Sequence, residues 1–123
     1  MNNDLTVLRV LYVEDNPADA ELAQRVLARV APWIDLDIAS TIAEAKATLQ
    51  QAELPDVLAT DLHLADGSGI ELVSWLRTCG LALPVVVLTA SGNHQSALTA
   101  LRAGADDYLT KHGDDLQRLP RIL

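Results

Sequence analysis

Apolar and polar residues alternate in blocks along this chain, and five of the blocks are typical of β-strands. Three blocks are nearly continuous apolar runs, the pattern of strands buried on both faces; they cover residues 8–13, 55–61 and 84–88. In residues 34–38, isoleucine and leucine alternate with aspartate, which predicts an edge strand with one face in water. Residues 107–110 form a brief last strand.

Helical periodicity fills the segments between these strands. Asn16 and Pro17 start the first helix, because asparagine caps the first turn and proline needs no amide hydrogen bond there. Thr41 and Glu44 predict a capping box for a second helix, which runs to about residue 52. The expected inward-facing residues are Leu22, Val26 and Val30, beside Ala23 and Leu27, in the first helix, and Leu72, Val73 and Leu76 in a third helix over about residues 70–79.

The order of these elements predicts the fold. Ala97, Leu98 and Leu101 indicate a short fourth helix, and a last helix after Asp114 is short or truncated because Pro120 falls within it. Strands that alternate with helices at this rhythm predict an α/β fold with a parallel sheet and right-handed crossovers. We expect a doubly wound five-stranded sheet in the order 2-1-3-4-5, with helices on both faces. Residues 1–123 are expected to form a single domain.

Polar side chains stand where the buried strands end. Glu14 and Asp15 follow the first strand, Asp61 ends the third, Thr89 follows the fourth and Lys111 the fifth. Each of them alone has an ordinary explanation, such as a helix start, a cap or a surface lysine. Because the carboxyl ends of parallel strands meet at one edge of the sheet, their joint occurrence predicts that they converge.

Such a cluster favours chemistry on a phosphoryl group. Three carboxylates at close range repel one another and need a cation. Lys111 supplies one positive charge, and one Mg²⁺ would neutralise the two negative charges that remain. Asp61 could then act as a nucleophile toward phosphorus, with the Thr89 hydroxyl donating a hydrogen bond to a transferring oxygen.

An ordered set of four segments carries a resemblance to a known family. They are residues 11–16, 56–69 around Asp61, 87–90 and 103–111, and through them the chain resembles a response-regulator receiver domain of flavodoxin-like fold over nearly its whole length. The resemblance implies that Asp61 is the phosphoacceptor and that Asp15 binds Mg²⁺ directly. It implies that Glu14 binds through water or from outside the first coordination sphere, and that His63 offers its backbone carbonyl to the metal.

The resemblance also implies a switch and a set of partners. Thr89 and Tyr108 resemble the family's switch pair, in which the hydroxyl moves to the phosphoryl group and the aromatic ring turns inward. The implied donor is a histidine kinase or a histidine phosphotransfer protein. The domain would be no turnover enzyme beyond its own phosphorylation and dephosphorylation. We expect it to belong to a larger sensor kinase or response regulator that carries an output domain, and a weak homodimer stays open.

Two positions depart from the family's pattern. His112 follows Lys111 where receivers usually have a proline in a cis peptide, and we expect a trans bond here because a cis bond without proline costs about 2.5–4 kcal/mol. Ala65 replaces a usual proline four residues after Asp61, which would loosen that loop. His63, two residues after Asp61, is placed to tune dephosphorylation.

Composition and charge exclude several other classes of protein. The net charge of -8 disfavours direct binding to nucleic acid or to anionic membranes. No apolar stretch reaches the roughly 18 residues of a membrane span, and no signal peptide is seen. The single cysteine, Cys79, excludes an internal disulfide framework. We therefore expect a cytoplasmic location.

Two alternative functions remain open. A receiver-like docking module that never accepts phosphate would need none of the acidic, hydroxyl and lysine set. A hydrolase with an aspartyl-phosphate intermediate commonly has a second aspartate two residues after the nucleophile, where this chain has His63. A dinucleotide-binding fold is disfavoured because no Gly-x-Gly-x-x-Gly follows the first strand.

Overall fold

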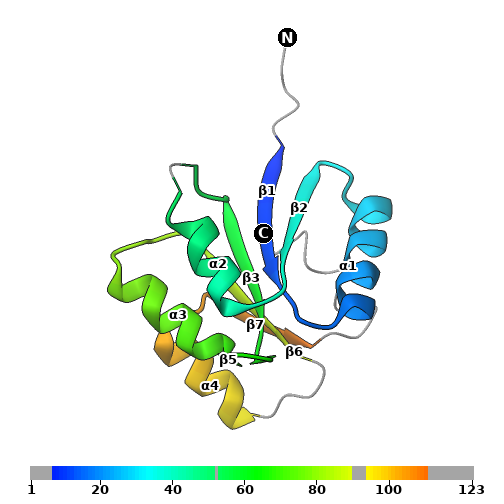
Figure 1. Ribbon diagram of the computed structural model, residues 1–123. Helices are drawn as coiled ribbons and strands as arrows, with labels where there is room; N and C mark the ends of the chain where they lie inside the picture. The colour runs from blue at the N-terminus through cyan, green and yellow to red at the C-terminus, as the bar shows by residue number, and fades with distance from the viewer. Residues whose placement is uncertain (1–6, 52, 90–93, 111–123) are drawn as a thin grey trace.

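The main element of the structure is a five-stranded parallel sheet. The structure is a computed structural model that describes residues 7–51, 53–89 and 94–110. The strands are β1 (Leu8–Val13), β2 (Ile34–Ala39), β3 (Val57–Asp61), β6 (Val85–Thr89) and β7 (Asp107–Thr110). Their order is β2-β1-β3-β6-β7 (Figure 1), which is the predicted order 2-1-3-4-5 when only these five are counted. The doubly wound, flavodoxin-like α/β fold is thus confirmed.

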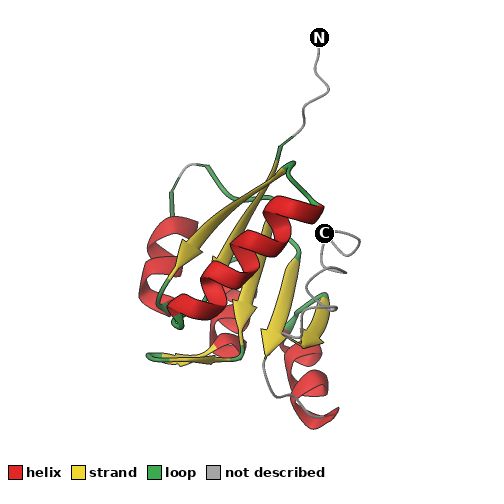
Figure 2. Ribbon diagram, turned by 90° about the vertical axis from the view of Figure 1, so that its right-hand side faces the viewer, coloured by secondary structure: helices red, strands yellow, loops and turns green. Residues whose placement is uncertain are grey.

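Helices cover both faces of this sheet, as predicted. They are α1 (Pro17–Val30), α2 (Ile42–Leu49), α3 (Gly69–Thr78) and α4 (His94–Ala103). In Figure 1, α1 lies on one side and the other three helices lie on the opposite side; Figure 2 shows α1 in front of the strands. Within the described ranges, no helix has both the length and the apolar character that a bilayer span requires. The predicted last helix falls in residues 111–123, outside the described part.

The core is divided by the sheet into two layers. Ala23 and Leu27 of α1 pack against Val10, Ala59 and Val86 on one face. On the other face α2, α3 and α4 contribute Ile42, Ala45, Leu49, Leu72, Val73, Leu76 and Ala100. All five residues of the central strand β3 are buried, whereas β2 alternates between half-buried and exposed residues as the edge strand it was predicted to be.

Two predicted helix faces need correction. The predicted burial of Val26, Ala23 and Leu27 in α1 is confirmed, and Ala20 is buried with them. Leu22 is 44% exposed and Val30 is only half-buried, so these two residues do not belong to the buried face. The fourth helix exists, but Leu98 and Leu101, which helped to indicate it, are exposed, and Ala100 fills the core instead. In both helices small alanines pack closely on the sheet, and Leu22, Leu98 and Leu101 lie outside the inward face.

The segment after β3, predicted as an open loop, contains a small hairpin. Two short strands, β4 (His63–Leu64) and β5 (Gly67–Ser68), pair in antiparallel fashion. Asp66 in the turn accepts hydrogen bonds from the amides of Ile42 (2.9 Å) and Ala43 (3.2 Å) at the start of α2. Thr41 also caps this helix, by accepting from the Glu44 amide at 3.0 Å. The loop after Asp61 is therefore tied to α2.

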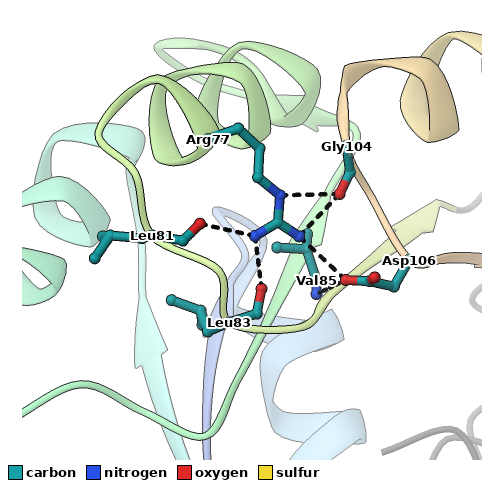
Figure 3. A network of polar contacts seen from close by, with 6 residues as sticks. All are labelled: Arg77, Leu81, Leu83, Val85, Gly104 and Asp106. Carbon is teal, nitrogen blue, oxygen red and sulfur yellow. Dashed lines mark hydrogen bonds and ion pairs between the residues drawn. The ribbon is translucent and has the colours of Figure 1, made fainter.

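Arg77 of α3 holds together the end of the sheet opposite the strand exits (Figure 3). Its guanidinium donates to the carbonyls of Leu81 (2.9 Å) and Leu83 (2.8 Å), and twice to that of Gly104 (3.1 and 2.9 Å). It also donates to Asp106 Oδ2 at 3.1 Å, and the same oxygen accepts from the Val85 amide at 2.7 Å. All five N–H donors of the arginine are used. They fix both the loop before β6 and the loop between α4 and β7.

Candidate functional site

Three carboxylates meet at the carboxyl edge of the sheet. Asp61 ends β3, while Glu14 and Asp15 follow β1, the strand that pairs with β3 in the register Val13 to Thr60. One ligand oxygen from each of the three acids lies within 4.8 Å of the other two. Glu14 and Asp61 are buried, with exposed fractions of 2% and 6%, and Asp15 is more open to solvent. The predicted convergence of these three residues is confirmed.

Glu14 is held in place by two donors. The Tyr12 hydroxyl donates to Glu14 Oε1 at 3.0 Å, and the Asn16 amide donates to Oε2 at 3.1 Å. Burial, followed by the nearby Glu14 charge, raises the pKa of Tyr12 far above its ordinary value, so the hydroxyl keeps its proton and remains a donor. Sequence reasoning missed Tyr12. The available signal was its position two residues before Glu14, on the same face of a strand.

The backbone behind Asp61 is tightly packed. Gly69 donates its amide to the Leu62 carbonyl at 2.9 Å, and a Cβ at Gly69 would overlap the Asp61 carbonyl oxygen. Thr60 donates its hydroxyl to that same oxygen at 3.0 Å. The hairpin segment thus returns directly against the residue that carries the site, and only glycine leaves enough room at position 69.

Thr89 and Tyr108, the predicted switch residues, lie on adjacent strands. Thr89 ends β6 and is buried, while Tyr108 of β7 lies opposite Val87, two positions before Thr89 in β6 and on the same face. Burial raises the pKa of Tyr108, an effect that nearby Ser96 partly opposes. The Tyr108 hydroxyl is buried.

The other predicted site residues are placed only in part. His63 lies in β4 with its side chain exposed, two residues from Asp61. Lys111 and His112 lie outside the described residues, and so does the peptide bond between them.

The acid cluster fits a hard divalent cation. Carboxylate oxygens are the ligands that Mg²⁺ and Mn²⁺ prefer, and Mg²⁺ usually keeps several waters beside one or two carboxylates. A pocket of about 330 Å³, lined by Glu14, Asp15 and Glu21 among others, opens beside the cluster. It leaves room for a partly hydrated ion. These residues therefore meet the chemical requirements of a magnesium site.

Comparisons with known proteins agree with this arrangement. The family model described as response regulator receiver domain matches residues 10–122. The response regulator protein PilR of Pseudomonas aeruginosa is 37% identical over 115 residues, which are 94% of this chain and 25% of PilR. The chain spans only 25–46% of the length of the curated relatives it matches.

Two solved structures are also similar. The phosphorylated cyanobacterial phytochrome response regulator RcpA has a TM-score of 0.78 and 30% identity, covering 94% of this chain and 88% of RcpA. The Mn²⁺-bound response regulator Rcp1 has a TM-score of 0.77 and 30% identity, covering 90% and 87%. The fold, the acids at the strand exits and the family match over residues 10–122 agree. The chain belongs to the response regulator receiver domains of two-component signalling.

Proposed function

We propose that this receiver domain accepts a phosphoryl group on Asp61 in a Mg²⁺-dependent reaction. The observation that carries the proposal is the meeting of Glu14, Asp15 and Asp61 within 4.8 Å at the carboxyl edge of the sheet. Surface acids rarely crowd together in this way with two of the three buried, because their charges repel and lose hydration. A bound cation explains why the arrangement is kept.

The transfer uses Asp61 as the nucleophile. One carboxylate oxygen attacks the phosphorus of a phosphohistidine, the O–P bond forms, and the N–P bond breaks as the imidazole leaves with the electron pair. Mg²⁺ bound by Asp15 and Asp61, near Glu14 and the His63 carbonyl, would supply positive charge for the transferring oxygens. The Thr89 hydroxyl, at the neighbouring strand end, donates a hydrogen bond to one of these oxygens, and Lys111 adds a positive charge.

A switch follows from the added charge. Phosphorylation changes the charge on Asp61 from -1 to roughly -2 and adds acceptor oxygens that attract the Thr89 hydroxyl. Tyr108, on the same face of the adjacent strand, then turns toward the space that Thr89 leaves. The register of β6 and β7 supports this step, because Tyr108 lies opposite Val87, two positions from Thr89. His63, exposed beside Asp61, is placed to tune the attack of water during dephosphorylation.

The proposed partners are those of a phosphorelay. The donor is a histidine kinase or a histidine phosphotransfer protein, and the receiver acts on an output domain or protein in turn. RcpA, a relative solved in its phosphorylated form, and Rcp1, solved with Mn²⁺, support the phosphoryl and metal parts of the proposal.

Phosphorylation by a small donor tests this function. We expect acetyl phosphate with Mg²⁺ to add the mass of one phosphoryl group to the chain, and peptide mapping to place it on Asp61. Asp61→Asn and Asp15→Asn should both abolish the added mass. Asp35→Asn, which removes an exposed acid on the edge strand β2, is the matched control and should react normally. A wild-type chain that never gains mass would favour the docking module, and multiple turnover of phosphate esters would favour a hydrolase.

A further inference from the structure

Tyr12 places a hydroxyl group in the layer of the core between the sheet and α1. Its ring is 2% exposed and packs in the cluster formed by Val10, Ala23, Leu27 and their neighbours on the α1 face. In the sheet it lies between Ile38 of β2 and Ala59 of β3. A phenylalanine would fill this space equally well, and burying a hydroxyl costs free energy unless it is hydrogen-bonded. The use of tyrosine therefore points to its hydrogen bond with Glu14.

The Tyr12 hydroxyl and the Asn16 amide each donate a hydrogen bond to a different carboxylate oxygen of Glu14. Oε1 accepts from the fixed Tyr12 ring at 3.0 Å, and Oε2 accepts from the Asn16 backbone at 3.1 Å. Neither donor can follow a rotating carboxylate, because one belongs to a packed ring and the other to the residue that caps α1. The plane of the Glu14 carboxylate is thereby set. A carboxylate oxygen can accept more than one contact, so these two hydrogen bonds are compatible with binding water or a metal ion.

We propose that Tyr12 is a positioning residue for the divalent metal site, acting through the Glu14 carboxylate. This inference rests on the proposed function, because it concerns the same metal site. Partners that orient a ligand in this way typically change metal affinity about 10–100-fold when they are removed. Without the Tyr12 hydroxyl, Glu14 would lose a hydrogen bond that holds its carboxylate beside Asp15 and Asp61.

A double-mutant cycle on metal binding tests the proposal. Mn²⁺ affinity of the purified chain is measured for the wild type, Tyr12→Phe, Glu14→Gln and the double variant. We expect Tyr12→Phe to weaken Mn²⁺ binding about tenfold in the wild-type background. In the Glu14→Gln background it should have less than about a twofold effect, since the group it orients has already lost its charge. A purely structural role would give the same loss in both backgrounds.

A control variant and a second readout separate the possible outcomes. Thr78→Val removes a hydroxyl that donates to the Ser74 carbonyl at 2.9 Å near the far end of α3, and it should leave Mn²⁺ affinity unchanged. In the metal-free protein, Tyr12→Phe should shift the amide resonance of Asn16, which reports on the other Glu14 oxygen. Wild-type Mn²⁺ affinity in Tyr12→Phe would overturn the inference alone. A wild-type chain that binds no Mn²⁺ would overturn the proposed metal site and the inference with it.

Discussion

The backbone of Asp61 lies so close to Gly69 that position 69 has no room for a side chain. Gly69 does not have a positive φ, so it is required for space and not for conformation. In Gly69→Ala the new Cβ would push the Asp61 carbonyl away, and we expect a loss of about 1–3 kcal/mol in the free energy of unfolding. Phosphorylation by acetyl phosphate should fall as well, because the nucleophile moves with its backbone.

Gly80 provides the matched comparison for that prediction. It has a φ of 81°, and a methyl group added there would meet no atoms within 4 Å, the reverse of the situation at Gly69. Gly80→Ala should cost about 1–2 kcal/mol through backbone strain and leave phosphorylation intact. Equal phosphorylation of both variants would contradict the role given to Gly69.

Sequence alone located the residues whose position follows from topology. Glu14, Asp15, Asp61 and Thr89 end or follow buried strands, and parallel pairing brings such residues to one edge. Tyr12 was not predicted, because within an apolar run a tyrosine looks like any other core residue. The strand period places Tyr12 and Glu14 on the same face, but it does not show that the ring's hydroxyl reaches the carboxylate.

Among the elements, the hairpin after β3 was the main feature missed. Strands of two residues carry no periodic pattern, and Asp66 reaches α2 across 24 positions of sequence. The longer elements were predicted well because their patterns repeat: β1 has its predicted bounds, and α1 starts at Pro17 with Asn16 as its cap.

The capping of α2 by Asp66 predicts that the free energy of unfolding depends on pH. The hydrogen bond from the Ile42 amide is the main cause that lowers the pKa of Asp66 below its ordinary value of 3.8. A carboxyl group whose pKa is lower when folded stabilises the protein above the unfolded pKa, and this contribution is lost as pH falls through the folded pKa. Asp66→Asn should therefore cost about 0.5–1 kcal/mol at pH 7, the low end for a cap because the side chain is exposed.

Urea unfolding at pH 7 and near pH 3 measures this effect. The difference between wild type and Asp66→Asn should shrink as pH falls below the ordinary pKa of 3.8 and through the lower pKa of folded Asp66. Asp37→Asn, which changes an exposed acid of β2, controls for general charge effects. A difference that stays constant over this pH range would contradict the charged cap.

The hydrogen bonds of Arg77 predict a larger effect on the free energy of unfolding than the Asp66 cap does. Arg77→Lys keeps the charge but cannot supply five donors in a planar fork, so the carbonyls of Leu81, Leu83 and Gly104 lose their partner. We expect a loss of about 2–3 kcal/mol in the free energy of unfolding. Arg25→Lys, which alters an exposed ion pair with Glu21, should change it by less than about 0.5 kcal/mol. Equal losses in the two variants would show that the Arg77 network contributes little.

At the scale of the whole molecule, the sheet order and both layers could be predicted from sequence. The reason is physical: alternating strands and helices with right-handed crossovers leave few ways to cover a parallel sheet. The partners of this domain could not be predicted, because output domains and kinases are recognised through surfaces that periodicity does not describe. The curated relatives, of which the chain spans 25–46%, show that receivers of this kind occur within longer proteins.

Charge links the site to the stability of the whole domain. The chain has a net charge of -8, and three of its carboxylates lie within 4.8 Å of one another, so the metal-free fold carries a repulsion that unfolding relieves. Asp15→Asn should therefore raise the free energy of unfolding of the metal-free protein by about 1 kcal/mol, the Coulomb energy of two unit charges about 4 Å apart in water. In the wild type, Mg²⁺ at a hundred times its Kd should add about 2.7 kcal/mol. Asp15→Asn should lose most of this gain.

Urea unfolding with EDTA and with Mg²⁺ measures both effects on the same proteins. The variant should be the more stable protein in EDTA and the less stable one in saturating Mg²⁺, so the order of the two stabilities reverses. Asp35→Asn, on the exposed face of β2, should follow the wild type in both conditions. Because general charge reduction would stabilise either variant regardless of metal, only a cation held by Asp15 explains a reversal confined to Asp15→Asn. An Asp15→Asn variant that gains as much from Mg²⁺ as the wild type would remove Asp15 from the metal site.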